Sequence, residues 1–307
     1  MRVSDHHHEH DHGHARAHDR AHDRGARNGG AFALSVGLNG VFVVVELVAG
    51  VLGGSVALVA DAAHNLGDVL GLLLAWVALR LARRKPSAKR TYGLRRSTIL
   101  ASLANALLLV LAVGAVAWEA IGRLRTPAHP QPMVMLVVAT VAILINGGSA
   151  LLFLEGRKHD ANVRGAFLHL VGDAAVSVGV LAAALLVMLT GWTWLDPVVS
   201  IVISLVILAS TWSLLRDALD LALDAVPAHI DAAEVRQFLA GCPNVLAVHD
   251  LHIWALSTTE TALTGHLVMR ESTDPSFLSN VSRKLEEDFE IHHTTLQIEP
   301  PGDCVGC

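Results

Sequence analysis

The stretch SVALVADAAHNLGDVLGLLLAWVAL (Ser55–Leu79) decides the fold of this chain. It is apolar and long enough to cross the roughly 30 Å hydrocarbon core of a bilayer as one α-helix. It nevertheless contains His64 and, four residues later, Asp68. Residues four apart lie on one face of a helix, so the imidazole and the carboxylate can reach one point beside it. A second apolar stretch repeats this spacing with His169 and Asp173.

The residue types in these two pairs indicate a metal site. Two imidazole nitrogens and two carboxylate oxygens form a tetrahedral set suited to Zn2+. The spacing alone is a weak signal, because the N-terminal tail contains it at His7 and Asp11. Its position inside apolar helices is stronger, since ionisable residues at membrane depth are costly and default to a functional role. The alternative is a pair of polar clamps that serve helix packing alone.

Asp61 is a further acid on nearly the same face, three residues before His64. It could orient the His64 imidazole, line an access path to the site, or bind the metal directly. The residues alone leave these alternatives open.

Composition places the chain among multi-span membrane proteins. Of its 307 residues, 52% are hydrophobic and 17% are charged, whereas soluble domains carry about 25% charged residues. Six apolar segments are each near or above the roughly 20 residues that a span requires. They cover residues 31–52, 55–79, 98–121, 133–154, 165–189 and 195–216. We therefore predict six transmembrane helices.

Basic residues predict the orientation of these helices. Lys and Arg are concentrated in the N-terminal tail, between spans two and three, and between spans four and five. The link between spans three and four holds only Arg123 and Arg125, and the link 191–197 holds no basic residue. The positive-inside rule then places both termini in the cytoplasm. The first thirty residues lack the apolar segment of a signal peptide.

The first thirty residues are predicted to be a disordered cytoplasmic tail. Histidines alternate there with Asp, Glu and Arg, a composition that cannot bury a core. They are His6, His7, His8, His10, His12, His14, His18 and His22. Weak, exchangeable metal binding is the expected role, and an expression tag is the alternative. The three cysteines are too few for a disulfide framework.

A change of composition near Pro227 indicates a second domain. Asp231 followed by Glu234 is a helix N-terminus signal, and the helix is expected to reach Ala240. Strands are predicted at 245–256 and 261–269, a helix at 275–289, and a last strand at 294–299. We therefore predict three parts: a tail (1–30), a six-helix membrane domain (31–222) and a cytoplasmic α/β domain of order αββαβ (223–307).

Candidate ligands also occur in this second domain. Strand alternation puts His249 and His252 on opposite faces, so they should not share a site. The last four residues, Cys304-Val305-Gly306-Cys307, have the Cys-x2-Cys spacing of a thiolate metal site. Two incidental cysteines are the alternative interpretation.

Together these features resemble the cation diffusion facilitator family, and among its members the bacterial zinc exporters with a His-rich N-terminus. The resemblance rests on the six spans, on Ser55–His64 with Asp68, and on the later His169/Asp173 pair. It implies a homodimer with a metal site between spans two and five, which exports metal from the cytoplasm in exchange for protons. It also implies a metallochaperone-like αββαβ domain that helps dimerisation and binds further metal.

The resemblance assigns roles to residues of this chain. It implies that His64, Asp68, His169 and Asp173 form the transport site, and that a His at position 64 favours zinc. It implies metal ligands at His249 and His266, with Glu299 as a third because Gln297 replaces a family His. The Cys304/Cys307 pair resembles one that completes this site in certain vesicular zinc transporters. A further family site in the loop between spans two and three needs His or Asp, and residues 83–96 contain neither.

The expected function is zinc export by exchange with protons, without an enzymatic reaction. Two carboxylates and Zn2+ sum to zero charge, and protons can replace the metal. A membrane metalloprotease is disfavoured because no His-Glu-x2-His or Gly-x-Ser-x-Gly motif is present; a zinc sensor or scaffold is the other alternative. Cd2+ and Co2+ are alternative substrates. We expect residence in a bacterial inner membrane, contact with lipid, no organic cofactor and no nucleic acid partner.

Overall fold

The computed structural model describes residues 37, 39–126, 129–154, 161–270 and 276–301. The chain divides into two compact units. The first comprises residues 1–69 and 113–205, and the second comprises residues 70–112 and 206–307. Helices α2, α3 and α6 each contribute to both units.

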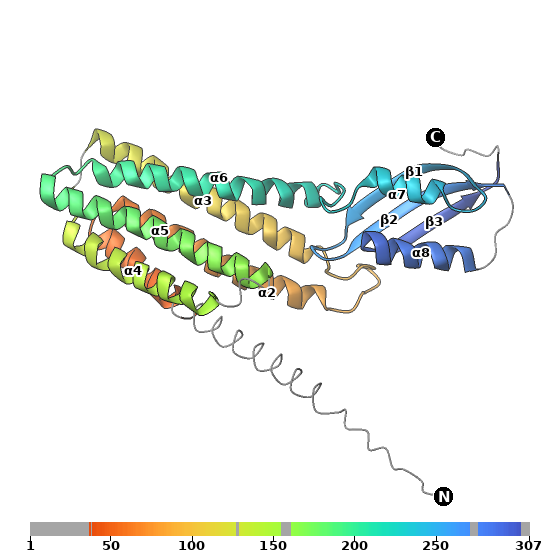
Figure 1. Cartoon of the computed structure of the whole chain (residues 1–307), viewed down its shortest axis with the longest axis horizontal. Helices are drawn as coiled ribbons and strands as arrows, with labels where there is room; N and C mark the ends of the chain where they lie inside the picture. The colour runs from red at the N-terminus through yellow and green to blue at the C-terminus, as the bar shows by residue number, and fades with distance from the viewer. Residues whose placement is uncertain (1–36, 38, 127–128, 155–160, 271–275, 302–307) are drawn as a thin grey trace, which may run out of the picture. The chain divides into compact units, whose positions relative to one another are not determined.

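Within the described part of the chain, five helices are long and apolar enough to cross a membrane. They are α2 (Val56–Ala82), α3 (Ser97–Arg125), α4 (Pro132–Phe153), α5 (Ala161–Thr190) and α6 (Leu195–Ala222) (Figure 1). A shorter apolar helix, Asn39–Leu52, precedes them. It corresponds to the predicted first span (31–52), of which the residues before 37 lie outside the described part of the chain. Large apolar side chains such as Trp118 (80% exposed) and Leu189 (77%) face outward, as expected of lipid-facing helices. The chain is an integral membrane protein.

The helices α5 and α6 are longer than hydropathy predicted. The predicted spans were 165–189 and 195–216, whereas α6 continues to Ala222. The added turns carry polar residues such as Asp217 and Asp220. Helical hydrogen bonding does not require apolar side chains, so a helix can continue past its apolar span.

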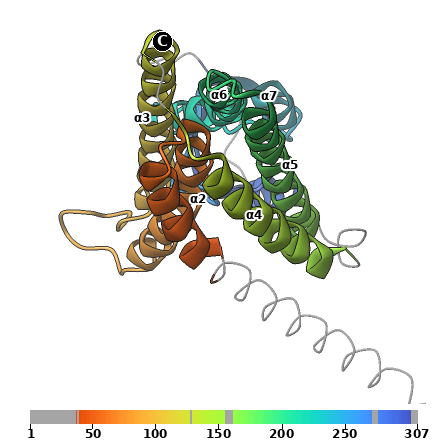
Figure 2. The ribbon, with the colours of Figure 1, turned by 90° about the vertical axis from the view of Figure 1, so that its left-hand side faces the viewer.

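In the first unit, α4 and α5 lie side by side (Figure 2). Phe153 of α4 packs with Leu170 of α5 at one end of this contact. Small residues such as Ala142 of α4 and Ala184 of α5 are fully buried. Small side chains allow membrane helices to approach each other closely.

A short turn of three residues, 53–55, joins helix 39–52 to α2. Gly54 has φ +65°, a left-handed conformation that glycine adopts without steric cost. A Cβ on Gly53 would lie 2.7 Å from the Ala49 carbonyl oxygen and 3.0 Å from Val134 Cγ1. The tight turn at Gly53-Gly54 therefore depends on the absence of side chains.

A carboxylate from another helix caps the beginning of α2. Asp196, in the first turn of α6, is 1% exposed. It accepts hydrogen bonds from Ser55 Oγ (2.5 Å), Val56 N (2.8 Å) and Ala57 N (3.3 Å). Two of these donors are backbone N–H groups that a helix leaves unpaired at its N-terminus, and the helix dipole favours a negative charge there. Asp196 thus fixes the start of α2 to the start of α6.

The second unit contains the predicted α/β domain. Its elements are α7 (Ala232–Ala240), β1 (Val245–Ala255), β2 (Thr261–Met269), α8 (Ser276–Phe289) and β3 (Ile291–Glu299) (Figure 1). The sheet order is β1-β2-β3, with β1 and β2 antiparallel and β2 and β3 parallel. Leu239, Leu267 and Leu285 belong to a core between the two helices and the sheet. The predicted order αββαβ is confirmed.

Two elements of this domain can be compared with the prediction residue by residue: the beginning of α7 and the beginning of β3. The predicted cap is present, since Asp231 accepts a hydrogen bond from Ala233 N at 2.7 Å. Strand β3 begins at Ile291, whereas the sequence predicted 294. Its first residues pair with Thr261 and Ala262 of β2. Pairing with a distant strand extends β3 where its local sequence gives no strand signal.

The cap on α2 generates a first prediction. Asp196→Ala leaves Ser55 and two buried backbone N–H groups without their acceptor. We expect the free energy of unfolding to fall by about 3 kcal/mol, because hydrogen bonds to a charged group contribute about 1.5–3 kcal/mol. Thermal unfolding of the purified protein in detergent measures this loss. Asp217→Ala is the matched control, since Asp217 is an exposed acid on the same helix. Equal unfolding temperatures of the two variants would contradict the cap.

Candidate metal sites

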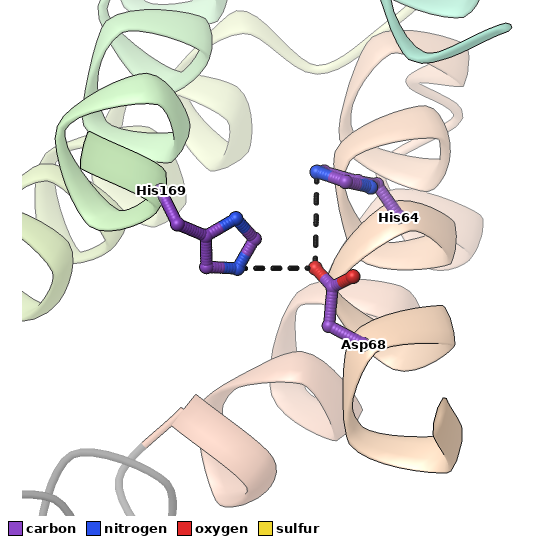
Figure 3. Close-up of side chains that lie close together, drawn as sticks. All are labelled: His64, Asp68 and His169. Atoms are coloured by element: carbon purple, nitrogen blue, oxygen red, sulfur yellow. Dashed lines mark ion pairs between the residues drawn. The ribbon is translucent and has the colours of Figure 1, made fainter. Parts of the chain in front are cut away.

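Helices α2 and α5 bring together all four residues of the two predicted pairs. Asp68 Oδ2 lies 3.8 Å from His64 Nε2 and 3.4 Å from His169 Nε2. Asp173 lies 3.6 Å from His64 Nε2 and 3.5 Å from His169 Nε2. Figure 3 shows the Asp68 carboxylate between the two imidazoles, which come from different helices. Each carboxylate therefore faces both histidines.

These distances have the scale of a metal coordination shell. A tetrahedron with metal–ligand bonds of about 2.0–2.2 Å has ligand–ligand edges of about 3.3–3.6 Å. Hydrogen bonds between nitrogen and oxygen are shorter, about 2.7–3.2 Å. The His64 and His169 ring centroids are 6.0 Å apart with the rings nearly perpendicular. The separations thus fit four groups around a shared ion better than two polar clamps, in which each Asp would bond one His.

The four ligand groups differ in exposure. The Asp173 side chain is 6% exposed, whereas the His169 side chain is 47% exposed. Asp68 Oδ2 is buried and has no hydrogen-bond partner among the described residues. A buried carboxylate oxygen without a donor is costly, so this oxygen needs a cation or a proton.

Among the described residues, Asp61 forms no hydrogen bond with the His64 imidazole. Asp61 accepts hydrogen bonds from Ser177 Oγ (3.1 Å) and Asn65 Nδ2 (3.5 Å). The buried His64 Nδ1 has no hydrogen-bond partner in the described part of the chain. The orienting role considered from the sequence has no hydrogen bond to support it.

Sequence reasoning assigned no role to Glu46, which the structure places beside Asp61. Glu46 is fully buried, and its Oε2 accepts a hydrogen bond from the same Asn65 Nδ2 at 3.3 Å. The sequence feature that could have identified Glu46 is an acidic residue in the middle of an apolar span.

The three strands of the α/β domain bring together a second group of ligands. His249 Nε2 lies 2.9 Å from Glu299 Oε2, and His266 Nδ1 lies 2.8 Å from Glu299 Oε1. His249 pairs with His266 across β1 and β2, and Val268 pairs with Glu299 across β2 and β3. The Glu299 side chain is 7% exposed. One ligand from each strand could therefore hold a metal ion.

Neighbouring side chains extend this strand cluster. Gln297 Nε2 donates to Glu299 Oε1 at 2.9 Å, so the residue at the position of a family His contacts the remaining acid. His252 lies apart from the cluster and bonds Asp250 Oδ1 at 2.9 Å. That hydrogen bond lowers the pKa of the Asp250 carboxyl below its usual value. Asp250 Oδ2 is also 3.6 Å from His266 Nε2.

Some predicted ligands lie outside the described residues. These are the histidines of the 1–30 tail and the pair Cys304 and Cys307, which remain predictions. The loop 83–96, which has neither His nor Asp, uses its arginines for contacts within the second unit. Arg95 Nη1 contacts Glu260 Oε2 at 2.6 Å and His293 Nε2 at 2.7 Å.

Comparisons with known proteins identify the family of both parts of the chain. Residues 32–221 match the cation efflux transmembrane domain, and residues 227–301 match the cation efflux protein cytoplasmic domain. The metal cation efflux system protein CzcD of Cupriavidus metallidurans is 38% identical over 268 residues, 87% of this chain and 85% of that protein. The zinc transporter ZitB of Escherichia coli is 38% identical over 272 residues, 88% of this chain and 85% of that protein.

Two further relatives were found. The cadmium, cobalt and zinc/H(+)-K(+) antiporter of Bacillus subtilis is 32% identical over 263 residues, 84% of this chain and 85% of that protein. The solved metal-bound C-terminal domain of the CzcD transporter is 38% identical, with a TM-score of 0.22, and covers 23% of this chain and 99% of that structure. Since the transmembrane family domain covers more than half of the chain, the protein belongs to the cation diffusion facilitator, or cation efflux, family.

Proposed function

We propose that this protein exports Zn2+ from the cytoplasm in exchange for protons, and that His64, Asp68, His169 and Asp173 bind the transported ion. The observation that carries the proposal is that Asp68 and Asp173 each lie 3.4–3.8 Å from both imidazoles. Family membership supports cation efflux, and the names of relatives include zinc transporters and an antiporter.

Charge balance explains how metal and protons can exchange at one site. Zn2+ and two carboxylates sum to zero when both imidazoles are neutral. When the metal leaves, two protons on the same four groups restore neutrality. When the site is electrically neutral, the free-energy cost of moving it through an apolar environment is lower. Alternating access, in which the site faces each side of the membrane in turn, is therefore feasible in both the metal-loaded and the protonated state.

The mixed set of nitrogen and oxygen ligands also favours a metal ion of intermediate softness. Imidazole suits Zn2+ well, whereas an all-oxygen set suits Mg2+ or Ca2+. Cd2+ and Co2+ remain alternative substrates, as the name of the Bacillus relative includes both metals. The proposal requires no organic cofactor, no nucleic acid partner and no enzymatic step.

In this proposal residues 31–222 form the transport domain and residues 223–307 a cytoplasmic domain that binds additional zinc. His249, His266 and Glu299 supply ligands from three strands, and Cys304 and Cys307 could complete the set. The cytoplasmic family match supports a homodimer. The distribution of basic residues supports cytoplasmic termini, and the bacterial relatives support the inner membrane.

Loss of one transport ligand should abolish exchange. Asp173→Ala removes a buried carboxylate and leaves the imidazoles without its charge, a change that costs about 3 kcal/mol or more. We expect the zinc affinity of the membrane site to fall at least about 100-fold. Zinc uptake into reconstituted vesicles with an imposed pH gradient measures the effect, and Asp217→Ala serves as the control. Wild-type flux that ignored the pH gradient would refute the proton exchange.

The side chain at position 64 should influence which metal ion the protein transports. His64→Asp replaces a nitrogen ligand with oxygen and adds a negative charge. We expect the flux ratio of Zn2+ to Cd2+ to fall, because imidazole favours zinc over an oxygen-rich set. Competition among Zn2+, Cd2+ and Co2+ in the same vesicles gives the ratio. An unchanged ratio, with flux retained, would contradict a ligand role for His64.

The strand cluster can be tested separately. Glu299→Gln removes the carboxylate that contacts both histidines, and we expect one class of zinc sites to disappear from an isothermal titration of the full chain. Asp173→Ala should remove a different class. Glu286→Gln changes an exposed acid on α8 and should leave the titration unchanged. If Glu299→Gln bound zinc like the wild type, the cytoplasmic site would have to lie elsewhere.

A further inference from the structure

Glu46 and Asp61 are two acids buried together in the membrane helices. Glu46 lies in helix 39–52 and is 0% exposed, while Asp61 lies in α2 and is 1% exposed. A single amide group, Asn65 Nδ2, donates to both carboxyl groups, at 3.3 and 3.5 Å. Both carboxyl groups therefore lie within reach of one amide nitrogen.

This pair lacks the positive charge that two carboxylates require. Among the described residues neither acid forms an ion pair, and its donors are an amide and a hydroxyl. Glu46 Oε1 has no hydrogen-bond partner in the described part of the chain. Two like charges buried side by side are not tolerated without a counter-ion or a proton.

From this geometry we propose that Glu46 and Asp61 form a proton-binding site separate from the metal cluster, and that its proton is one of those exchanged for zinc. The inference rests on the proposed zinc/proton exchange. On α2, His64 and Asp68 follow Asp61 by three and seven residues, and among the described residues none of the hydrogen bonds of Glu46 or Asp61 goes to the side chains of the four proposed metal ligands.

Ser177 connects the carboxyl pair to the metal cluster. Its hydroxyl lies 3.1 Å from Asp61 Oδ2 and 3.0 Å from the carbonyl oxygen of Asp173, four residues earlier on α5. One hydroxyl carries one hydrogen, so it favours Asp61 when that carboxylate is ionised. The Ser177 contact therefore makes the state of the pair depend on α5, which carries two of the metal ligands.

Electrostatics links the proton to metal occupancy. Among the described residues, the other titratable groups that interact electrostatically with the pair are His64 of α2 and Asp173 of α5. A divalent ion bound by these residues acts as the nearby counter-ion that the fully ionised pair requires, so the pair can lose its proton when the ion binds. In the exchange the carboxylic O–H bond breaks, the proton passes to water, and the carboxylate keeps the hydrogen bonds from Asn65 and Ser177. Departure of the metal allows one proton to return.

The number of protons moved per zinc ion tests the proposal. Glu46→Gln replaces the carboxyl group by a neutral group of the same shape. In vesicles that report zinc and proton flux together, we expect this variant to move one proton fewer per zinc than the wild type. Glu119→Gln is the control, a glutamate on α3 whose side chain is 59% exposed. An unchanged ratio in Glu46→Gln would overturn the proposal.

Infrared spectroscopy decides the question if Glu46→Gln fails to transport. The full-length, metal-free wild type should show a carboxylic acid C=O band that weakens when zinc is added and is absent from Glu46→Gln. In Asp173→Ala the band should remain when zinc is added. A missing band, or one that zinc leaves unchanged in the wild type, would overturn the proposal. Absence of pH-driven zinc flux in the wild type would instead refute the proposed function, while the band would still report the proton.

Discussion

The cost of burying a carboxylate among apolar helices is the constraint on which the membrane part depends. The structure meets it in three ways. Asp196 accepts hydrogen bonds from a hydroxyl and two backbone N–H groups, so its charge is stabilised permanently. Asp173 faces two imidazoles that can gain or lose protons. Among the described residues, Glu46 and Asp61 have only an amide and a hydroxyl as donors. The first arrangement serves stability, whereas the other two leave charge to be supplied by an ion or a proton.

This difference relates the fold to the proposed exchange. Helix α2 is held at its beginning by Asp196 and carries His64 about two turns further along. The positions of His64 and Asp68 are therefore fixed relative to the beginning of α2, whereas His169 and Asp173 lie on α5. Movement that changes the separation of the two helices would change the ligand distances directly. A site shared between two helices can thus couple occupancy to helix position, which a site on one helix cannot do.

The α/β domain uses the same residue types in a more rigid setting. A sheet fixes the relative positions of its side chains through backbone pairing, and β1, β2 and β3 each supply one group to the cluster. Glu299 contacts both histidines at 2.8–2.9 Å, closer than the carboxylates of the membrane cluster. The shorter contacts have hydrogen-bond lengths, so a metal ion would have to separate these groups, and the buried His266 Nδ1 has no hydrogen-bond partner among the described residues.

The sequence alone determined the features that depend on local pattern. Hydropathy located the apolar spans, helical spacing placed His64 with Asp68 and His169 with Asp173, and turn and cap residues gave the order αββαβ. The family resemblance also predicted that Asp68 and His169 share one site and that Glu299 joins both strand histidines in another, but the distances between these groups come from the tertiary structure. Only the tertiary structure brings Glu46 beside Asp61. It also decided that β3 begins at Ile291. Period and hydropathy describe neighbours along the chain, whereas these contacts follow from helix packing and strand register between segments far apart in sequence.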